Sequence, residues 1–257
     1  MGDLGVLKHK SKEIHVLVIG AGPWREHTRN PANMIASALP TQLKQSASSD
    51  IDINIHAAPR PWTVSYSWVK ENIPPMLFPQ EPSPAVSSPE ATSANGNHTP
   101  GSAERKPNYD IVLFLGMAAG RNYYTLEVQG HRDGYKFLDV DGNLPADADF
   151  WARAGAPEVL HTSFDTETLH RLWRDKVPAD IDVRPSDNAG YYLCDYIYYT
   201  GLFEYWRQGG KDIEKTRPCM FLHVPGEAEA DDIARGVTAA EGLIRAMASC
   251  WTDEQYK

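Results

Sequence analysis

The sequence predicts a single α/β domain over residues 1–257, built as three α/β/α layers with a mostly parallel central sheet. Three apolar runs have the composition of buried strands: Ile14–Ile19, Tyr109–Gly116 and Cys219–Val224. Segments with helical spacing alternate with these runs, which is the order typical of a parallel sheet covered on both faces. A chain of 257 residues that is 42% hydrophobic can bury one large core.

The other elements continue this alternation. We expect helices over residues 31–39, 62–72, 166–176 and 227–247, and shorter strands at Ile51–Ala57, Tyr124–Gln129 and Ile181–Arg184. The first helix begins at Asn30-Pro31. The second is expected to end before Pro74-Pro75, because proline disfavours a helical residue in front of it. Residues 41–50 and 139–145 are expected to be connecting turns.

One segment differs from the rest in composition. Residues 79–108 hold six prolines and five serines and no aromatic residue. Such a segment cannot bury enough apolar surface to fold, so we expect a disordered insertion within the domain.

Charge and cysteine usage exclude several classes of protein. Lys plus Arg is 25 against 34 for Asp plus Glu, a net charge of −9, so nucleic-acid binding has no electrostatic basis. The first 12 residues lack the apolar core of a secretory signal, and no apolar run is long enough to span a membrane. Three cysteines without Cys-x-x-Cys spacing argue against disulfides and structural zinc, so we expect a cytosolic protein.

The Gly20-Ala21-Gly22 turn after the first strand is a weak match to a nucleotide-binding loop. Pro23-Trp24 follows it and the third glycine of that fingerprint is missing. A pyrophosphate site is therefore not expected here.

The stretch Ser186–Tyr199 contains the strongest candidate for chemistry. The polar turn Ser186-Asp187-Asn188 has the residue types that cap helices, so a helix is expected to follow and to reach about Gln208. Cys194 then lies near its first turn, where unpaired N–H groups favour a negatively charged nucleophile. Position alone favours the alternative of a small buried thiol.

His223 and Glu127 are the candidate partners of this thiol. His223 lies late in a strand and Glu127 in a short strand, near the sheet edge where sites form in α/β proteins. A cysteine hydrolase needs a thiolate, an imidazole and a group that orients the imidazole. By spacing alone, a core histidine and a solvated glutamate explain these two residues equally well.

Four motifs, in matching order, resemble the pyroglutamyl peptidase I family, also called pyrrolidone-carboxylate peptidases. They cover nearly the whole chain outside residues 79–108. They are Gly20-x-x-Pro23-Trp24 with Asn30-Pro31, Leu115-Gly116-Met117-Ala118-x-Gly120-Arg121 with Thr125-Leu126-Glu127, Ser186-x-x-Ala189-Gly190-x-Tyr192-Leu193-Cys194-Asp195, and Phe221-Leu222-His223-Val224-Pro225.

The resemblance implies a role for each matched residue. Cys194 is implied as nucleophile, His223 as the proton-transferring base and Glu127 as the group that orients the imidazole. Two aromatic residues of the family's first loop, which help to hold the pyroglutamyl ring, fall on Ala21 and Trp24. Lys136 takes the place of an arginine that helps to stabilise the oxyanion, and lysine lacks the planar fork of arginine.

The resemblance also implies an overall function. We expect a thiol protease that removes the N-terminal pyroglutamyl (5-oxoproline) residue from peptides, without a metal or organic cofactor. Bacterial members of that family often form tetramers, so a homo-oligomer is one expectation. Two alternatives stay open: a cysteine hydrolase with a shifted acyl substrate, and a non-catalytic binding protein on the same fold. The features that favour the binding protein are Ala21, Lys136 and Asp195, where the family typically has Asn.

Overall fold

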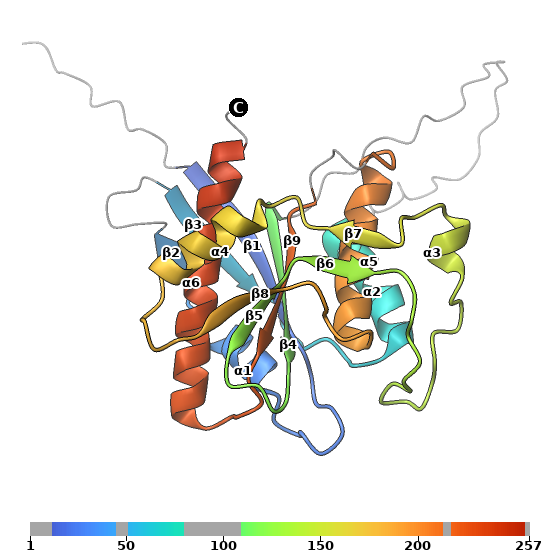
Figure 1. Cartoon of the computed structure of the whole chain (residues 1–257), viewed down its shortest axis with the longest axis horizontal. Coiled ribbons are helices and arrows are strands. Elements are labelled where there is room, and N and C mark those ends of the chain that lie inside the picture. Colours follow the sequence, from blue (N-terminus) through green and yellow to red (C-terminus); the bar gives the residue numbers. More distant parts are fainter. Residues whose placement is uncertain (1–11, 45–50, 80–108, 213–216, 255–257) are drawn as a thin grey trace, which may run out of the picture.

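The computed structural model describes residues 12–44, 51–79, 109–212 and 217–254 (Figure 1). The predicted insertion at 79–108 lies outside these residues, except for Pro79. None of the helices in the described ranges is long and apolar enough to cross a membrane.

The middle layer is a seven-stranded sheet in the order β2-β3-β1-β4-β9-β5-β8. Its strands are β1 (Lys12–Gly20), β2 (Gln42–Lys44), β3 (Ile51–Ala57), β4 (Ile111–Met117), β5 (Tyr124–Glu127), β8 (Val183–Ser186) and β9 (Cys219–Val224). Strands β3, β1, β4 and β9 run parallel, as their continuous apolar runs predict for strands buried on both faces. Strand β5 is antiparallel to β9 and parallel to β8, and β2 is antiparallel to β3.

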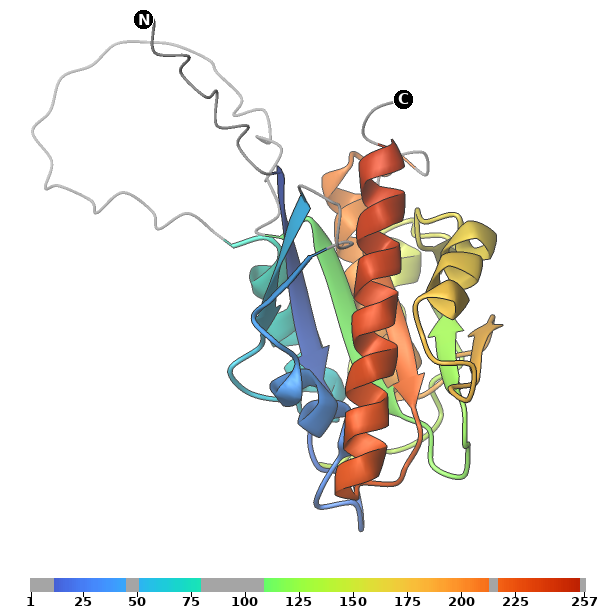
Figure 2. The same ribbon diagram turned by 90° about the vertical axis from the view of Figure 1, so that its left-hand side faces the viewer.

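Helices cover both faces of this sheet, so the predicted three-layer architecture is confirmed (Figures 1 and 2). One face carries α1 (Pro31–Ala38), α4 (Thr166–Asp175) and α6 (Ala230–Glu254). The other face carries α2 (Tyr66–Leu77) and α5 (Leu193–Gln208), with α3 (Phe150–Arg153) and a two-stranded sheet of β6 (Gln129–His131) and β7 (Val159–His161). Gly20 allows α1 to lie close to β1, since a Cβ there would be 2.5 Å from the carbonyl oxygen of Ala32.

The prediction of a helix over residues 62–72 is wrong in its bounds. Helix α2 begins at Tyr66 and continues through Pro74 and Pro75 to Leu77. Both prolines lie in the last turn, where a missing N–H costs little, and the buried side chains of Ile73 and Leu77 offset that cost. Tertiary packing therefore overrides the local helix-stopping signal.

The predicted strand Tyr124–Gln129 is divided in two. Strand β5 ends at Glu127, and the chain leaves the central sheet to form β6. Gly130 lies directly on α5, because a Cβ there would be 3.0 Å from the Cα of Tyr199. The expected connector at 41–50 also contains β2, and the final helix runs from 230 to 254 instead of from 227 to 247.

Candidate active site

His223 occupies the centre of the site because of its register in the sheet. It pairs with Gly116 of β4 on one side and with Thr125 of β5 on the other. Because side chains alternate along a strand, Glu127 lies on the same face as Thr125. The sheet itself therefore brings the predicted base and its predicted orienting carboxylate together.

Cys194 is the second residue of α5, at the end of the helix where backbone N–H groups are unpaired. The N-cap residue is Tyr192, so the expectation that the Ser186-Asp187-Asn188 turn caps this helix is wrong. Those side chains make local turns instead. Ser186 Oγ accepts the N–H of Asn188 at 3.2 Å, and Asn188 Oδ1 accepts the N–H of Gly190 at 2.9 Å.

The absence of a side chain at Gly116 makes room for the thiol. A Cβ at this position would lie 2.8 Å from Sγ of Cys194 and 2.5 Å from Cζ of Phe221. Cys194 is half-buried in this gap, and its thiol is hydrogen-bonded to His223. Gly116 thus allows the nucleophile to reach the histidine that lies beside it in the sheet.

Glu127 is fully buried and holds the other side of the imidazole. His223 Nδ1 lies 2.8 Å from Glu127 Oε1. Thr125 Oγ1 donates to the same oxygen at 2.9 Å and accepts from Arg121 at 3.2 Å. No donor within the described residues reaches Glu127 Oε2. The carboxylate is therefore directed toward His223 by a chain of donors that ends at Arg121.

These contacts favour the charged form of His223. Burial acts to lower its pKa, but the Cys194 thiol and the Glu127 carboxylate outweigh burial and raise the pKa from 6.5 to about 9. The imidazolium form consequently predominates at neutral pH. A histidine in this state can give a proton to a leaving group.

A second buried histidine–carboxylate pair lies beside the nucleophile. The carboxylate of Asp195 accepts the backbone N–H of His131 and contacts His131 Nδ1, both at 3.0 Å. Burial raises the pKa of Asp195 to about 6, although His131 acts to lower it. His131 stacks on Tyr191, with ring centroids 4.4 Å apart, and Tyr191 has a φ of 50° in the turn before Cys194. The pair thus joins β6 to the start of α5.

A cavity of about 410 Å³ opens at the start of α5. Its lining includes Tyr192, two residues before Cys194, and Trp24, whose indole donates to the Tyr192 hydroxyl at 3.3 Å. The full lining is Pro23, Trp24, Arg25, Leu138, Asp139, Val140 and Tyr192. Ala21, the other predicted substrate-binding residue, is not among them. It is 2% exposed and bridges to Trp62.

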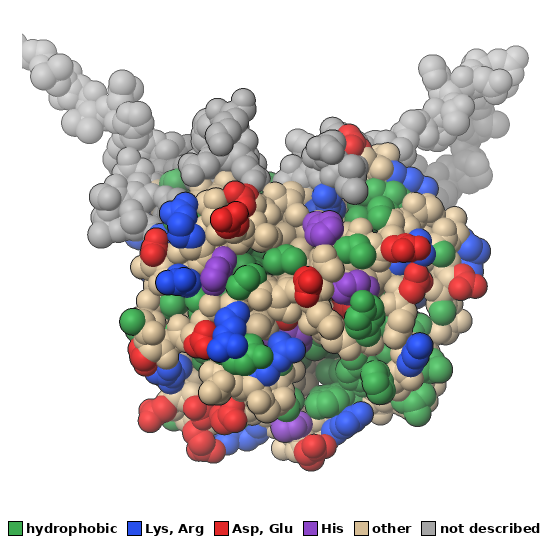
Figure 3. All heavy atoms as spheres, viewed as in Figure 1, with side chains coloured by type: hydrophobic (Ala, Val, Ile, Leu, Met, Phe, Trp, Pro, Cys, Tyr) green, Lys and Arg blue, Asp and Glu red, His purple; other side chains and the backbone are tan. Residues whose placement is uncertain are grey.

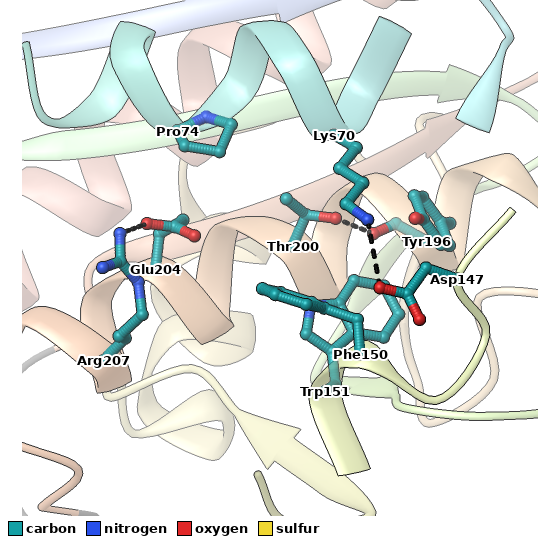
Figure 4. Close-up of a pocket in the computed structure, with 9 residues that line it drawn as sticks. All are labelled: Lys70, Pro74, Asp147, Phe150, Trp151, Tyr196, Thr200, Glu204 and Arg207. Carbon is teal, nitrogen blue, oxygen red and sulfur yellow. Dashed lines mark hydrogen bonds and ion pairs between the residues drawn. The ribbon is translucent and has the colours of Figure 1, made fainter. Parts of the chain in front are cut away.

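Lys136 lies elsewhere. It is exposed and lines a separate cavity with Asp147, Trp151 and Tyr196. Its predicted oxyanion role stays a prediction, without a contact to Cys194 among those of the described residues. Figure 4 shows a neighbouring cavity of about 280 Å³ between α2, α3 and α5, which includes neither Cys194 nor His223 in its lining.

Sequence reasoning brought together Cys194, His223 and Glu127, but it assigned no role to Gly116, Thr125 or the His131–Asp195 pair. Thr125 could have been found from its two-residue spacing to Glu127 in a strand. The His131–Asp195 contact left no local signal, because 64 positions separate the partners. No cluster of three or more metal-binding side chains occurs within the described ranges.

The chain matches known proteins over most of its length. Residues 95–241 match the family model Peptidase_C15, described as pyroglutamyl peptidase. Human pyroglutamyl-peptidase 1 is 26% identical over 227 residues, which cover 87% of this chain and 86% of the human protein. Pyrrolidone-carboxylate peptidase of Deinococcus radiodurans is 33% identical over 124 residues, which cover 46% of this chain and 50% of that protein.

Solved structures show the same fold. The pyrrolidone carboxyl peptidase of Fervidobacterium islandicum superposes with a TM-score of 0.60 at 18% identity, covering 92% of this chain and 99% of that chain. The enzyme of Thermus thermophilus gives a TM-score of 0.54 at 20% identity, covering 89% and 99% of the two chains. The likeness covers the predicted mostly parallel α/β architecture.

Proposed function

The chain belongs to the pyroglutamyl peptidase family of cysteine peptidases, and from this premise we propose that Cys194, His223 and Glu127 remove the N-terminal pyroglutamyl residue from peptides. The observation that supports this assignment is the convergence of the three side chains. The Cys194 thiol is bonded to His223, and His223 Nδ1 lies 2.8 Å from buried Glu127. Three distant segments supply the nucleophile, the proton carrier and the orienting carboxylate.

The chemistry follows from these positions. The Cys194 thiolate attacks the carbonyl that joins the pyroglutamyl residue to the peptide, and the backbone N–H of Cys194 at the helix start holds the developing oxyanion. The His223 imidazolium then protonates the leaving amine, and a thioester on Cys194 remains. Neutral His223 takes a proton from water, which attacks the thioester and releases free pyroglutamate. Lys136 is the weaker candidate for a second oxyanion donor, because it lines another cavity.

The cavity at Trp24 and Tyr192 is the candidate site for the pyroglutamyl ring. It lies at the start of the helix that bears Cys194, and its aromatic walls suit a flat lactam. Arg25 lies over the Trp24 ring, 4.5 Å from its centroid. An incoming ring would therefore meet the open edge of the indole or displace Arg25.

The cellular setting fits a thiol enzyme. All three cysteines are free, and Cys194 is the most exposed of them. Free thiols are usual in the reducing cytosol, so we place the enzyme there. Family membership argues against a non-catalytic binding protein, in spite of Ala21, Lys136 and Asp195.

A fluorogenic pyroglutamyl amide tests the proposal. We expect the wild-type protein to hydrolyse it, and iodoacetamide to stop turnover by alkylating Cys194. Cys194→Ala should abolish hydrolysis, whereas the matched variant Cys219→Ala should keep it, since Cys219 is fully buried in β9. Turnover by Cys194→Ala at equal folded concentration would refute the mechanism. Alkylation of Cys194 without turnover of this amide would indicate a shifted acyl substrate.

A further inference from the structure

The loop between β6 and α3 exposes apolar side chains beside the candidate ring site. Phe137, Leu138 and Val140 are 58%, 57% and 43% exposed. Figure 3 shows hydrophobic side chains gathered at the lower right of the face, where Figure 1 draws this loop. Neighbouring apolar side chains left in water are a mark of binding surfaces.

The backbone of this loop is held in place by a buried carboxylate. Asp139 is 7% exposed and accepts the N–H groups of Tyr66, Asp141 and Asn143 at 2.9–3.0 Å. The Val140 N–H donates to the Val64 carbonyl at 3.2 Å. The loop therefore buries its polar group and presents its apolar side chains on a fixed frame, the reverse of an ordinary surface turn.

The same loop is bonded to the segment that leads into the nucleophile. The Tyr192 hydroxyl donates to the Leu138 carbonyl at 2.8 Å, and the Phe137 and Tyr192 rings are 6.1 Å apart. Leu138 and Val140, here called the apolar rim, line the cavity together with Trp24 and Tyr192. The rim is thus continuous with the site proposed for the pyroglutamyl ring.

We infer that the apolar rim binds the side chain of the peptide residue that follows the pyroglutamyl group, and that this side chain is apolar. The inference rests on the proposed function, because a peptide whose first carbonyl lies at Cys194 must extend past the cavity walls. The charge of Asp139 is already met by backbone donors, so it offers nothing to a polar side chain. A Leu or Ile side chain would cover the rim and release water from both surfaces.

Two neutral substrates of similar size isolate this contact. Release of pyroglutamate from pyroglutamyl-leucine amide and pyroglutamyl-asparagine amide would be followed by chromatography, and kcat/KM compared. We expect the wild type to prefer leucine about tenfold, at the low end of what apolar pockets achieve. Leu138→Ser should reduce that ratio to about twofold, and adding Val140→Ser should bring it near one.

Leu144→Ser is the matched control. Leu144 is 49% exposed on the same loop but does not line the cavity, so the preference should stay about tenfold. A wild-type ratio near one would overturn the inference. So would an equal loss on both substrates in Leu138→Ser, because the rim would then contact the ring. Failure of the proposed function looks different, since neither peptide would be cleaved.

Discussion

The two buried histidine–carboxylate pairs of this protein are alike in geometry and differ in what surrounds them. His223 Nδ1 lies 2.8 Å from Glu127, and His131 Nδ1 lies 3.0 Å from Asp195. Both carboxylates are 0% exposed. Glu127 keeps one oxygen without a donor in the described residues, and its histidine meets the Cys194 thiol. Asp195 uses both oxygens on His131 alone.

The ring nitrogens opposite the carboxylates show the same contrast. His223 uses its second nitrogen on the thiol, whereas His131 Nε2 lies 3.2 Å from the side-chain nitrogen of Gln129. That nitrogen also donates to the Asp187 carbonyl at 3.0 Å. The first pair is open toward a reactive group, and the second is closed on both sides. A histidine–carboxylate contact therefore indicates chemistry only when the far nitrogen meets a nucleophile or substrate.

Matched replacements of the two histidines should separate their roles most strongly. We expect His223→Gln to lower kcat about 10³-fold, because no other group can move the proton. His131→Gln should leave kcat within a few-fold and lower the free energy of unfolding by about 1–3 kcal/mol. Steady-state kinetics and urea unfolding would be measured on both variants. Equal losses of kcat would contradict the distinction.

Removing the charge of Glu127 should change the pH profile. The pKa of His223 is about 9, so kcat/KM should fall as pH rises through 9 and the imidazolium is lost. Glu127→Gln removes one of the groups that raise this pKa, and the alkaline limb should move down by about one pH unit. Activity at neutral pH should fall about 10²-fold, since the ring loses its orienting charge. An unmoved limb would show that Glu127 does not act on His223.

Truncation of Asp195 should act on stability more than on catalysis. Asp195→Ala leaves the N–H and ring of His131 buried without their acceptor, and we expect a loss of about 3 kcal/mol in the free energy of unfolding. The kcat should fall at most about tenfold at equal folded concentration, through displacement of the α5 start. Loss of all activity in a folded variant would place Asp195 in the reaction itself.

Asp195→Asn gives the smallest and most specific effect. The pKa of Asp195 is raised from 3.8 in the unfolded chain to about 6 by burial, so its contribution to stability is complete below pH 3.8 and is lost as pH rises through 6. Asn keeps an acceptor for the His131 N–H without the charge. The variant should therefore gain about 1–3 kcal/mol over the wild type as pH rises from 4 to 7. A difference that does not vary with pH would contradict the assigned charge.

Much of the catalytic assignment could be predicted from local pattern. The Thr125-Leu126-Glu127 alternation places the threonine and glutamate on one face of a strand, and this face is where His223 lies. The residues that lead into Cys194 predicted a helix, although Tyr192 caps it. Lys136 was predicted by counting along the chain, and counting gives no direction for a side chain in a loop.

By itself, the sequence determined the alternation of strands and helices, the apolar runs of the central strands and the identities of the thiol, imidazole and carboxylate. These properties are local, because side-chain spacing and helix-start composition act over a few residues. Only the tertiary structure decided that α2 passes through Pro74, that Gly116 opens the gap for Cys194, and that His131 and not His223 closes on Asp195. Those outcomes depend on contacts between segments distant along the chain, whose energies no short stretch of sequence contains.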